Sequence, residues 1–414
     1  MGLFSCRNIG IFWSCIILGV SYFLYTPVPD GFAEPWKLRT VLASFKVVGL
    51  LGAISEKLGY DSSLNVTRKL AKLALGSEIF SKNDPELEVK DTLFDGVPVR
   101  IYKPVNIKTP AAGLVFYHGG GWVMLSVDTY DIFTSFLAKK ANIIVISVEY
   151  RLAPEHPFPI PFDDCVTATL HLLQNSEKYG VDPTRVAIGG DSAGGNLAAA
   201  VSQRLAIEPE SFVSKPKLQL LIYPCLQATD FNLPSYLQNN GMGGALTKRM
   251  MIRFWMNYIG LKNVSVDDYY FFNNFHTTSF VKQSEYGAYT NVKLLPANIQ
   301  NQALKFENRD EDTNYELAAK IEDTILNPYF APLMAQDLSK APPAYIMNAE
   351  FDVLRDDGLL YGERLRQAGV RVHEHNVRHA FHGFITPIGP SETLRYKLGL
   401  KVLDEICQYL KRKL

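Results

Sequence analysis

Charge imbalance and cysteine are the two things this sequence has little of. Lys and Arg together number 42, and so do Asp and Glu, so nothing draws the whole chain to nucleic acid or to an acidic surface. Five cysteines in 414 residues are too few for a disulfide scaffold. We therefore expect an ordered globular chain with no nucleic-acid partner, whose cysteines serve mainly as small core residues.

The sequence also lacks the motifs of metal and nucleotide sites. There is no HExxH and no paired cysteine spacing, and the triple glycine at 119–121 is followed neither by the Lys-Ser or Lys-Thr of a P-loop nor by the GxGxxG spacing. Half of the eight histidines fall within ten residues, at positions 373, 375, 379 and 382. This grouping alone does not make a zinc site, so we predict no metal and no cofactor.

Charged residues are absent between Asn8 and Pro29, where the run 9–25, IGIFWSCIILGVSYFLY, is nearly all apolar or aromatic. A helix that spans a bilayer needs ~17 to 25 apolar residues, whereas the apolar part of a cleaved signal peptide has only ~7 to 15. The length therefore favours a membrane anchor over a signal peptide. Arg7 precedes the run and acidic residues follow it, which favours a cytosolic amino end with the bulk of the chain lumenal.

Two sequons, at Asn65 and Asn263, are candidate glycosylation sites that a lumenal domain could carry. After the anchor, residues 38–59 form long apolar stretches with few charges and predict a helix. This helix has two readings that stay open. It is either a core or cap element, or a second contact with the bilayer or with an apolar substrate.

Short apolar strands alternate with helical segments from residue 112 onward, after a predicted β-hairpin at 87–104. The strand segments are 113–118, 142–150, 185–190 and 218–224. Strands buried on both faces are continuously apolar, and their alternation with helices indicates a mostly parallel sheet covered on both sides. Catalytic groups in such folds lie at the carboxyl ends of the strands.

The segment GDSAG at 190–194 lies between an apolar strand and an alanine-rich helix. In a GxSxG elbow the serine lies on a sharp, strained turn between the strand and the helix. The strand and the helix contact each other there, so the positions of Gly190 and Gly194 require a residue as small as glycine. Ser192 is thereby exposed at the top of the sheet, near the positive amino end of the helix. We predict that Ser192 is a nucleophile and that Asp191 and the two glycines support the motif.

A serine nucleophile needs a base and an orienting carboxylate, which in this architecture follow it in the order acid, then histidine. Asp352, just beyond the predicted strand 344–349, is the predicted acid. Its acidic neighbours are interpreted differently. Glu350 should point into or under the sheet, while Asp356 and Asp357 should cap the following helix.

Two histidines compete for the role of base, because His379 and His382 both follow a predicted strand at 370–377. Gly383 leaves room for the ring of His382 to turn inward. We predict His382 as the base, with His379 as the rival.

The segment HGGGW at 118–122 places three consecutive glycines directly after an apolar strand. Glycine is costly in an ordered chain, but bare N–H groups can approach the oxyanion of an acyl-transfer intermediate. We predict that three residues donate these N–H groups: Gly119, Gly120 and Ala193. Gly121 is predicted to support the motif. His118 is also assigned a supporting role, because the base of this architecture comes after the acid.

Three motifs, in order, resemble the hormone-sensitive-lipase-like (GDXG) branch of the α/β hydrolases: HGGGW at 118–122, EYRLAPEHPFP at 149–159 and GDSAGGNLA at 190–198. The apolar start and DVLRDDG at 352–358 are similar to the arylacetamide deacetylase and arylacetamide deacetylase-like group. The resemblance implies a carboxylic ester hydrolase, anchored in the endoplasmic reticulum membrane as a single-pass type II protein with a lumenal catalytic domain. By motif, it implies the same site residues: Ser192, Asp352, His382, Gly119, Gly120 and Ala193.

The expected fold is an α/β-hydrolase fold with helices on both faces of the sheet and a cap built from the amino-terminal region and an insert. Its expected parts are a cytosolic stub and signal-anchor helix at 1–27, cap and membrane-proximal helices at 28–84, and a catalytic domain at 85–414 with a cap insert at about 227–324. An apolar cap would favour small-molecule esters or amides, including aryl amides and neutral lipid esters; residues 267–275 could equally be simple packing. The alternative function is a catalytically silent, membrane-anchored lipid-binding or scaffolding homologue.

Overall fold

The computed structural model describes residues 6–28, 30–76, 79–207, 214–241, 245–261, 264–301, 310–386 and 395–414. An eight-stranded sheet lies at its centre, in the order β1-β2-β4-β3-β5-β6-β7-β8. The ladders of β1 with β2 and of β2 with β4 are antiparallel, and the others are parallel. The mostly parallel sheet of the α/β prediction is therefore confirmed.

The strands are β1 (Leu87–Phe94), β2 (Val97–Pro104), β3 (Ala111–Tyr117), β4 (Ile144–Val148), β5 (Val181–Asp191), β6 (Leu218–Ile222), β7 (Ala344–Phe351) and β8 (Val372–Phe381). The predicted hairpin is present, with Asp95 and Gly96 at positive φ between β1 and β2. Strand β8 is longer than predicted and includes His379, because a register shift between Ala349 and Phe351 lets its pairing with β7 continue as far as Phe381.

The helices are α1 (Cys6–Leu24), α2 (Pro35–Lys57), α3 (Ser63–Leu75), α4 (Asp131–Ala141), α5 (Ile160–Gln174), α6 (Ala193–Ile207), α7 (Pro234–Gln238), α8 (Lys248–Ile259), α9 (Val264–Phe272), α10 (Ser279–Gln283), α11 (Glu285–Tyr289), α12 (Ala297–Gln300), α13 (Tyr315–Ile325), α14 (Arg355–Gln367) and α15 (Lys397–Lys413). Short 3₁₀ turns cover Phe80–Asn83, Ser176–Tyr179, Val292–Leu294, Asp310–Asp312 and Pro332–Met334.

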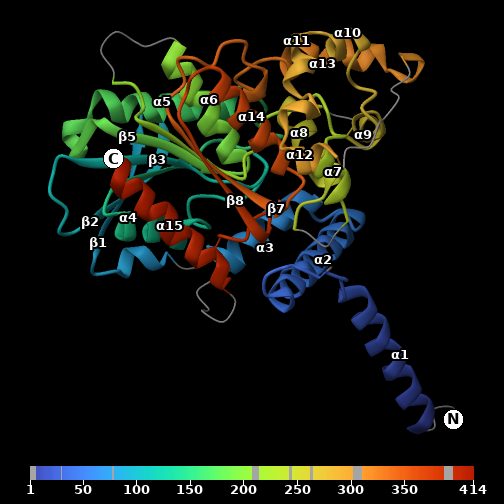
Figure 1. The fold of residues 1–414 in the computed structure, drawn as a ribbon. Helices are drawn as coiled ribbons and strands as arrows, with labels where there is room; N and C mark the ends of the chain where they lie inside the picture. The colour runs from blue at the N-terminus through green and yellow to red at the C-terminus, as the bar shows by residue number, and fades with distance from the viewer. Residues whose placement is uncertain are drawn as a thin grey trace.

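Two hydrophobic cores lie on opposite faces of the sheet. Alternate residues of β3 enter different cores, with Val115 in one and Leu114 and Phe116 in the other, as the two-residue period of a strand requires. Helices α5, α6 and α14 cover the first face, whereas α4 and α15 cover the second (Figure 1). Helices α7 to α13 gather between β6 and β7 in the chain, at one end of the molecule.

The amino-terminal region contributes three helices, of which α1 covers the predicted anchor and extends away from the rest of the chain (Figure 1). Helix α2 confirms the helix predicted at 38–59. Among the described side chains, α2 is long and apolar enough to cross a bilayer by its length and composition, and the part of α1 from Phe12 to Leu24 is apolar but shorter.

Candidate active site

Ser192 lies alone between the end of β5 and the start of α6, in the turn that the GxSxG motif predicts. Its φ is 55°, a left-handed conformation that is strained for a residue with a side chain. A Cβ on Gly190 would collide with the carbonyl oxygen of Gly194, and a Cβ on Gly194 with that of Tyr117. The two glycines are therefore required by the close passage of strand and helix.

Three side chains from distant parts of the sequence form one hydrogen-bonded chain. His382 Nε2 lies 2.9 Å from Ser192 Oγ, and His382 Nδ1 lies 2.7 Å from Asp352 Oδ2. Ser192 is 8% exposed, Asp352 is 1% exposed, and the His382 side chain is 13% exposed. Solvent therefore reaches the serine end of this chain, whereas the carboxylate is buried.

Neighbouring groups hold the Asp352 carboxylate and its backbone in place. The backbone N–H of Leu354 donates to Asp352 Oδ1 at 2.9 Å, which leaves Oδ2 for the histidine. Asn239 Nδ2 donates to the Asp352 carbonyl oxygen at 2.8 Å. Asn239 was not singled out in the sequence, and nothing local to it indicates this contact.

His379, the rival base, points elsewhere. It lies within β8 at φ 62° instead of in the loop beyond the strand, and its Nδ1 is hydrogen-bonded to the carbonyl oxygen of Gly31. Its backbone N–H donates to Glu350 Oε2 at 2.7 Å. Glu350 is consequently half-buried at the end of β7 and not under the sheet as predicted, because the bulge in β8 offers its carboxylate an N–H there.

Asp356 and Asp357 lie in the first turn of α14, but the prediction that they cap it is wrong. The position before the helix is Leu354, with no side-chain cap. Asp356 instead accepts the N–H of Ser235 at 2.7 Å, and Asp357 accepts the N–H of Leu226 at 2.9 Å. Both carboxylates are fully buried. Asp356 fastens the insert to α14, and Asp357 fastens the segment that follows β6 to the same helix.

The HGGGW loop runs from β3 toward the elbow, and its three glycines differ in role. The N–H of Gly119 donates to Asp191 Oδ1 at 2.9 Å and lies 3.1 Å from the Tyr130 hydroxyl. It is therefore already used, contrary to the expectation that it donates to an oxyanion. Gly120 and Gly121 have φ of 109° and 62°, and neither N–H has a hydrogen-bond partner within the described part of the chain.

Asp191 joins the elbow to the glycine loop. Its Oδ2 accepts the Tyr130 hydroxyl at 2.8 Å and the Tyr223 hydroxyl at 3.4 Å. The ring of Tyr223 lies 4.7 Å from that of His382. Burial raises the pKa of Asp191 to about 6, against hydrogen bonds that lower it. Tyr223 follows a strand at its carboxyl end and could have been found by that rule, whereas Tyr130 has no such signal.

His118 is fully buried beside this network. Its ring stacks on Tyr150 at 4.3 Å, and its Nδ1 lies 2.8 Å from the carbonyl oxygen of Gly119. Burial lowers the pKa of His118 to about 4, so the ring is neutral at pH 7. A neutral, enclosed imidazole packs the loop and has no access to solvent.

Side chains from both regions expected to form a cap contact the loop. A Cβ on Gly121 would collide with the ring of Phe254 on α8, and Trp122 stacks on Tyr258 of the same helix at 4.3 Å. From α3, Arg68 Nε donates to the Val123 carbonyl oxygen at 2.6 Å. Part of the segment 267–275 is packing, since Phe271 is buried and stacks on a buried histidine, His276, at 4.2 Å.

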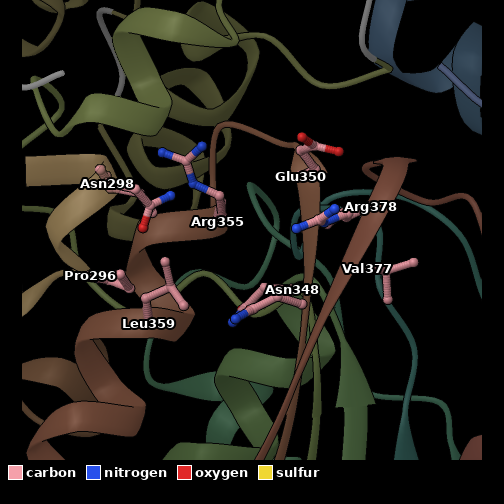
Figure 2. A pocket seen from close by; sticks show the side chains of 11 residues that line it. Pro296, Asn298, Asn348, Glu350, Arg355, Leu359, Val377 and Arg378 are labelled. Atoms are coloured by element: carbon pink, nitrogen blue, oxygen red, sulfur yellow. The ribbon is translucent and has the colours of Figure 1, made fainter. Parts of the chain in front are cut away.

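A cavity of about 370 Å³ opens beside the end of β7, between α12, α14 and β8 (Figure 2). Asn348, Glu350 and Arg378 are among its polar lining residues. Neither Ser192 nor His382 lines it, so it is separate from the serine and its histidine.

The remaining predictions concern the glycosylation sequons, a metal site and the cysteines. Asn65 is partly exposed on α3, where its Nδ2 donates to Asp61 at 2.9 Å, while Asn263 lies outside the described residues. The described part of the chain holds no group of three His, Cys, Asp or Glu side chains placed to bind a metal. Cys165, Cys225 and Cys407 are free and buried, which confirms their prediction as core residues.

Comparison with known proteins identifies relatives of this chain. A family model described as the α/β hydrolase fold matches residues 114–284 and 291–386. Arylacetamide deacetylase from Oryctolagus cuniculus is 38% identical over 406 residues, covering 96% of this chain and 98% of that protein. Neutral cholesterol ester hydrolase 1 from Rattus norvegicus is 34% identical over 415 residues, covering 97% and 99%.

A solved structure of an esterase from Pyrobaculum calidifontis superposes with a TM-score of 0.62 and 28% identity, over 88% of this chain and 97% of that one. The strained serine, the parallel sheet and matches over nearly the full length lead to one assignment: the chain belongs to the α/β hydrolase family, in the group of carboxylic ester hydrolases that includes arylacetamide deacetylase and neutral cholesterol ester hydrolase.

Proposed function

We propose that this protein hydrolyses carboxylic esters through an acyl-enzyme, with Ser192 as nucleophile, His382 as general base and Asp352 as the group that orients the histidine. The observation that carries the proposal is the hydrogen-bonded chain from Ser192 Oγ through His382 to Asp352, with distances of 2.9 Å and 2.7 Å. A serine hydroxyl is a weak nucleophile by itself, and such a chain is the arrangement that activates it.

The reaction then follows in two halves. Ser192 Oγ attacks the ester carbonyl carbon while its proton moves to His382 Nε2, and the intermediate collapses as the same nitrogen returns the proton to the leaving alcohol. Water next attacks the acyl-enzyme, giving its proton to His382, and the carboxylic acid leaves as Ser192 regains its hydrogen. Asp352 holds the histidine ring through Nδ1 and stabilises the imidazolium that forms at each attack.

Three N–H groups are proposed to stabilise the oxyanion: Gly120, Gly121 and Ala193. Gly121 replaces Gly119 in this role, because the N–H of Gly119 is donated to Asp191. Ala193 begins α6, so its N–H lies at the positive amino end of that helix. Loss of one such donor typically lowers the rate ~100- to 1000-fold.

Apolar carboxylic esters, including neutral lipid esters, are the proposed substrates, and aryl amides are a second candidate class. The names of two relatives support this range, since one is a deacetylase of arylacetamides and the other a hydrolase of neutral cholesterol esters. Aromatic rings beside the loop, including Phe254, offer apolar contact to an acyl or aryl group.

We place the protein in the endoplasmic reticulum membrane, held by α1 as a signal anchor with the catalytic domain lumenal. An apolar helix at the amino end and the charge distribution around it support this placement.

The decisive experiment is labelling with a fluorophosphonate probe. We expect wild type to be labelled and to hydrolyse p-nitrophenyl esters, and Ser192→Ala to do neither while remaining folded by circular dichroism. Ser202→Ala, in the same helix α6, is the matched control and should be labelled like wild type. A panel of esters and anilides graded by acyl length then defines the substrate.

Folded wild-type protein that takes no label and turns over no ester would overturn this proposal. The silent lipid-binding homologue would then be the better description.

A further inference from the structure

Helix α2 carries a row of apolar side chains directed away from the rest of the chain. We call it the outer stripe, and its members are Trp36, Val47, Leu50, Leu51, Ile54 and Leu58, which follows the last turn. Their exposed fractions run from 40% to 64%. At 100° per residue these positions fall on one side of the helix. Val47, Leu50, Leu51, Ile54 and Leu58 follow one another along this side, whereas Trp36 lies about three turns away, beyond Thr40, Ala43 and Ser44. An exposed apolar surface of this kind marks contact with a membrane or a partner.

The opposite side of α2 is attached to the protein at two places, near its first turn and at Gly52, while Phe45 between them is 51% exposed. Leu38 is fully buried, and Lys37 donates to the carbonyl oxygen of Arg395. Gly52 packs so closely on α3 that a Cβ there would lie 3.1 Å from the Ser63 carbonyl oxygen. A helix held to the domain at both of these places is expected to lie on the domain surface, which argues against α2 crossing a bilayer despite its length and apolar composition.

The outer stripe is continuous with the anchor. Lys46 Nζ, near the middle of α2, donates to the carbonyl oxygens of Phe23 and Tyr25 at 2.9 Å each, at the end of α1. The guanidinium of Arg39 lies 5.6 Å from the ring of Tyr25. Figure 1 shows α1 leaving the protein beside α2. A bilayer that holds α1 therefore reaches α2.

The charges beside the stripe suit a lipid surface. Arg39, Lys46 and Lys57 fall on one flank of the stripe by helical position, and the stripe itself contains no charged residue. A helix with an apolar face and flanking cations lies in the plane of the membrane interface, with the cations at the phosphates. Lys46 is already bonded to the end of α1, so this role falls to Arg39 and Lys57. A second copy of this chain would bring the same cations together, which disfavours it as the occupant.

The amino-terminal region that carries the stripe also contacts the segment before His382 and the segment after the glycine loop. The N–H of Ala33 donates to the carbonyl oxygen of His379 at 3.0 Å, three residues before His382. Arg68 of α3 donates to Val123, two residues after the glycine loop. The orientation of α2 on a membrane therefore fixes the orientation of the active site.

We propose that the outer stripe of α2 is a second membrane contact, inserted in the interface of the bilayer that holds α1. It turns the active site toward the lipid surface, so that apolar esters dissolved in the bilayer reach Ser192 directly. This last step rests on the proposed hydrolase function, whereas the membrane contact itself does not.

Nitroxide labels in the full-length chain test the contact. Cys6 and Cys15 are first changed to serine, and the protein is reconstituted in vesicles of phosphatidylcholine and phosphatidylserine. Four variants then carry one label each: Leu18→Cys in α1, Leu51→Cys in the stripe, Glu56→Cys on the opposite side of α2, and Phe280→Cys on α10, which is 77% exposed. Relaxation by oxygen reports lipid, and relaxation by a water-soluble nickel complex reports water.

We expect oxygen to dominate at positions 18 and 51, and the nickel complex to dominate at 56 and 280. If position 51 resembles 280 while 18 stays in lipid, the stripe proposal is wrong and the anchor stands. If position 18 is also in water, the anchor itself fails and the stripe proposal with it. Dipolar broadening between labels at position 51 would instead identify a second copy on the stripe and overturn the proposal.

Substrate entry is tested with the combined variant Leu50→Ser, Leu51→Ser and Ile54→Ser. We expect hydrolysis of a long-chain ester embedded in the vesicles to fall at least about tenfold, as loss of interfacial burial predicts. Hydrolysis of soluble p-nitrophenyl acetate should not change, and Phe280→Ser should affect neither substrate. Equal effects on both esters would contradict entry from the bilayer while leaving the hydrolase function intact.

Discussion

Two histidines separated by two residues have different surroundings in this protein, and that difference can be measured. His382 contacts Ser192 and Asp352, whereas the Nδ1 of His379 is bonded to Gly31 in the amino-terminal segment. We expect His382→Ala to lower kcat by ~10²- to 10⁴-fold, the usual effect of losing a general base. His379→Asn should keep nearly full kcat, because asparagine tolerates the left-handed backbone at this position. Steady-state kinetics on a soluble ester provide the comparison.

The reverse result, with His379→Asn inactive and His382→Ala active, would show that the base has been assigned to the wrong residue. Thermal unfolding of both variants excludes loss of folding as the cause.

His118 gives a pH-dependent prediction at the same scale. Its pKa is lowered from 6.5 to about 4 by burial, so the folded protein binds its proton more weakly than the unfolded chain does. The stability that the neutral ring contributes is therefore complete above pH 6.5 and is lost as the pH falls toward 4. His118→Gln should be less stable than wild type at pH 7, and the difference should shrink at pH 5.

Urea denaturation of the two proteins in detergent, at pH 7 and pH 5, measures this difference. Each unit of pKa shift corresponds to about 1.4 kcal/mol. A difference that stays constant with pH would show that His118 does not titrate as stated.

At the scale of elements, the segment between α1 and α2 acts on both strands that carry the acid and the base. Phe32 is 7% exposed, and its ring lies 4.3 Å from that of Phe351, which precedes Asp352. It also lies 6.4 Å from the ring of Phe381, which precedes His382. The segment therefore packs behind two members of the triad at once.

We expect Phe32→Ala to lower the free energy of unfolding by ~3 to 5 kcal/mol, as other large-to-small core changes do, and also to lower kcat by loosening the end of β8. Thermal unfolding and kinetics on a soluble ester measure the two effects. Phe280→Ala, at a residue that is 77% exposed, is the control and should change neither. A loss of stability with kcat unchanged would show that the segment supports the fold alone.

The same scale shows what could be predicted from the sequence. The strands and the turn that carries Ser192 could be predicted, because apolar runs and the GxSxG spacing are local signals. Three features could not be predicted from the sequence: the length of β8, the hydrogen bond that occupies the N–H of Gly119, and the hydrogen-bond partner of Asp356. Each depends on a contact across a long stretch of chain, such as the bond from Gly119 to Asp191, 72 residues away. Local pattern carries no information about such contacts.

At the scale of the whole molecule, the proposed lumenal topology predicts how the chain behaves in sealed microsomes. Protease added outside should leave the chain beyond the anchor intact, and detergent should expose it to digestion. Asn65 is partly exposed at the start of α3, so an endoglycosidase-sensitive glycan is expected there and should be absent from Asn65→Gln. Digestion without detergent would instead place the catalytic domain in the cytosol.

The contact between Phe254 and Gly121 also defines how this enzyme could be recombined with its relatives. The ring occupies the space that a side chain at 121 would need, so helix α8 and the glycine loop are shaped as a complementary pair. A chimera that exchanges the insert between β6 and β7 would have to bring a residue of matching shape at position 254. An exchanged insert must therefore match the host at the contact between residues 254 and 121 as well as at its two chain ends. Variant libraries that alter specificity should keep Phe254 and Gly121 unchanged.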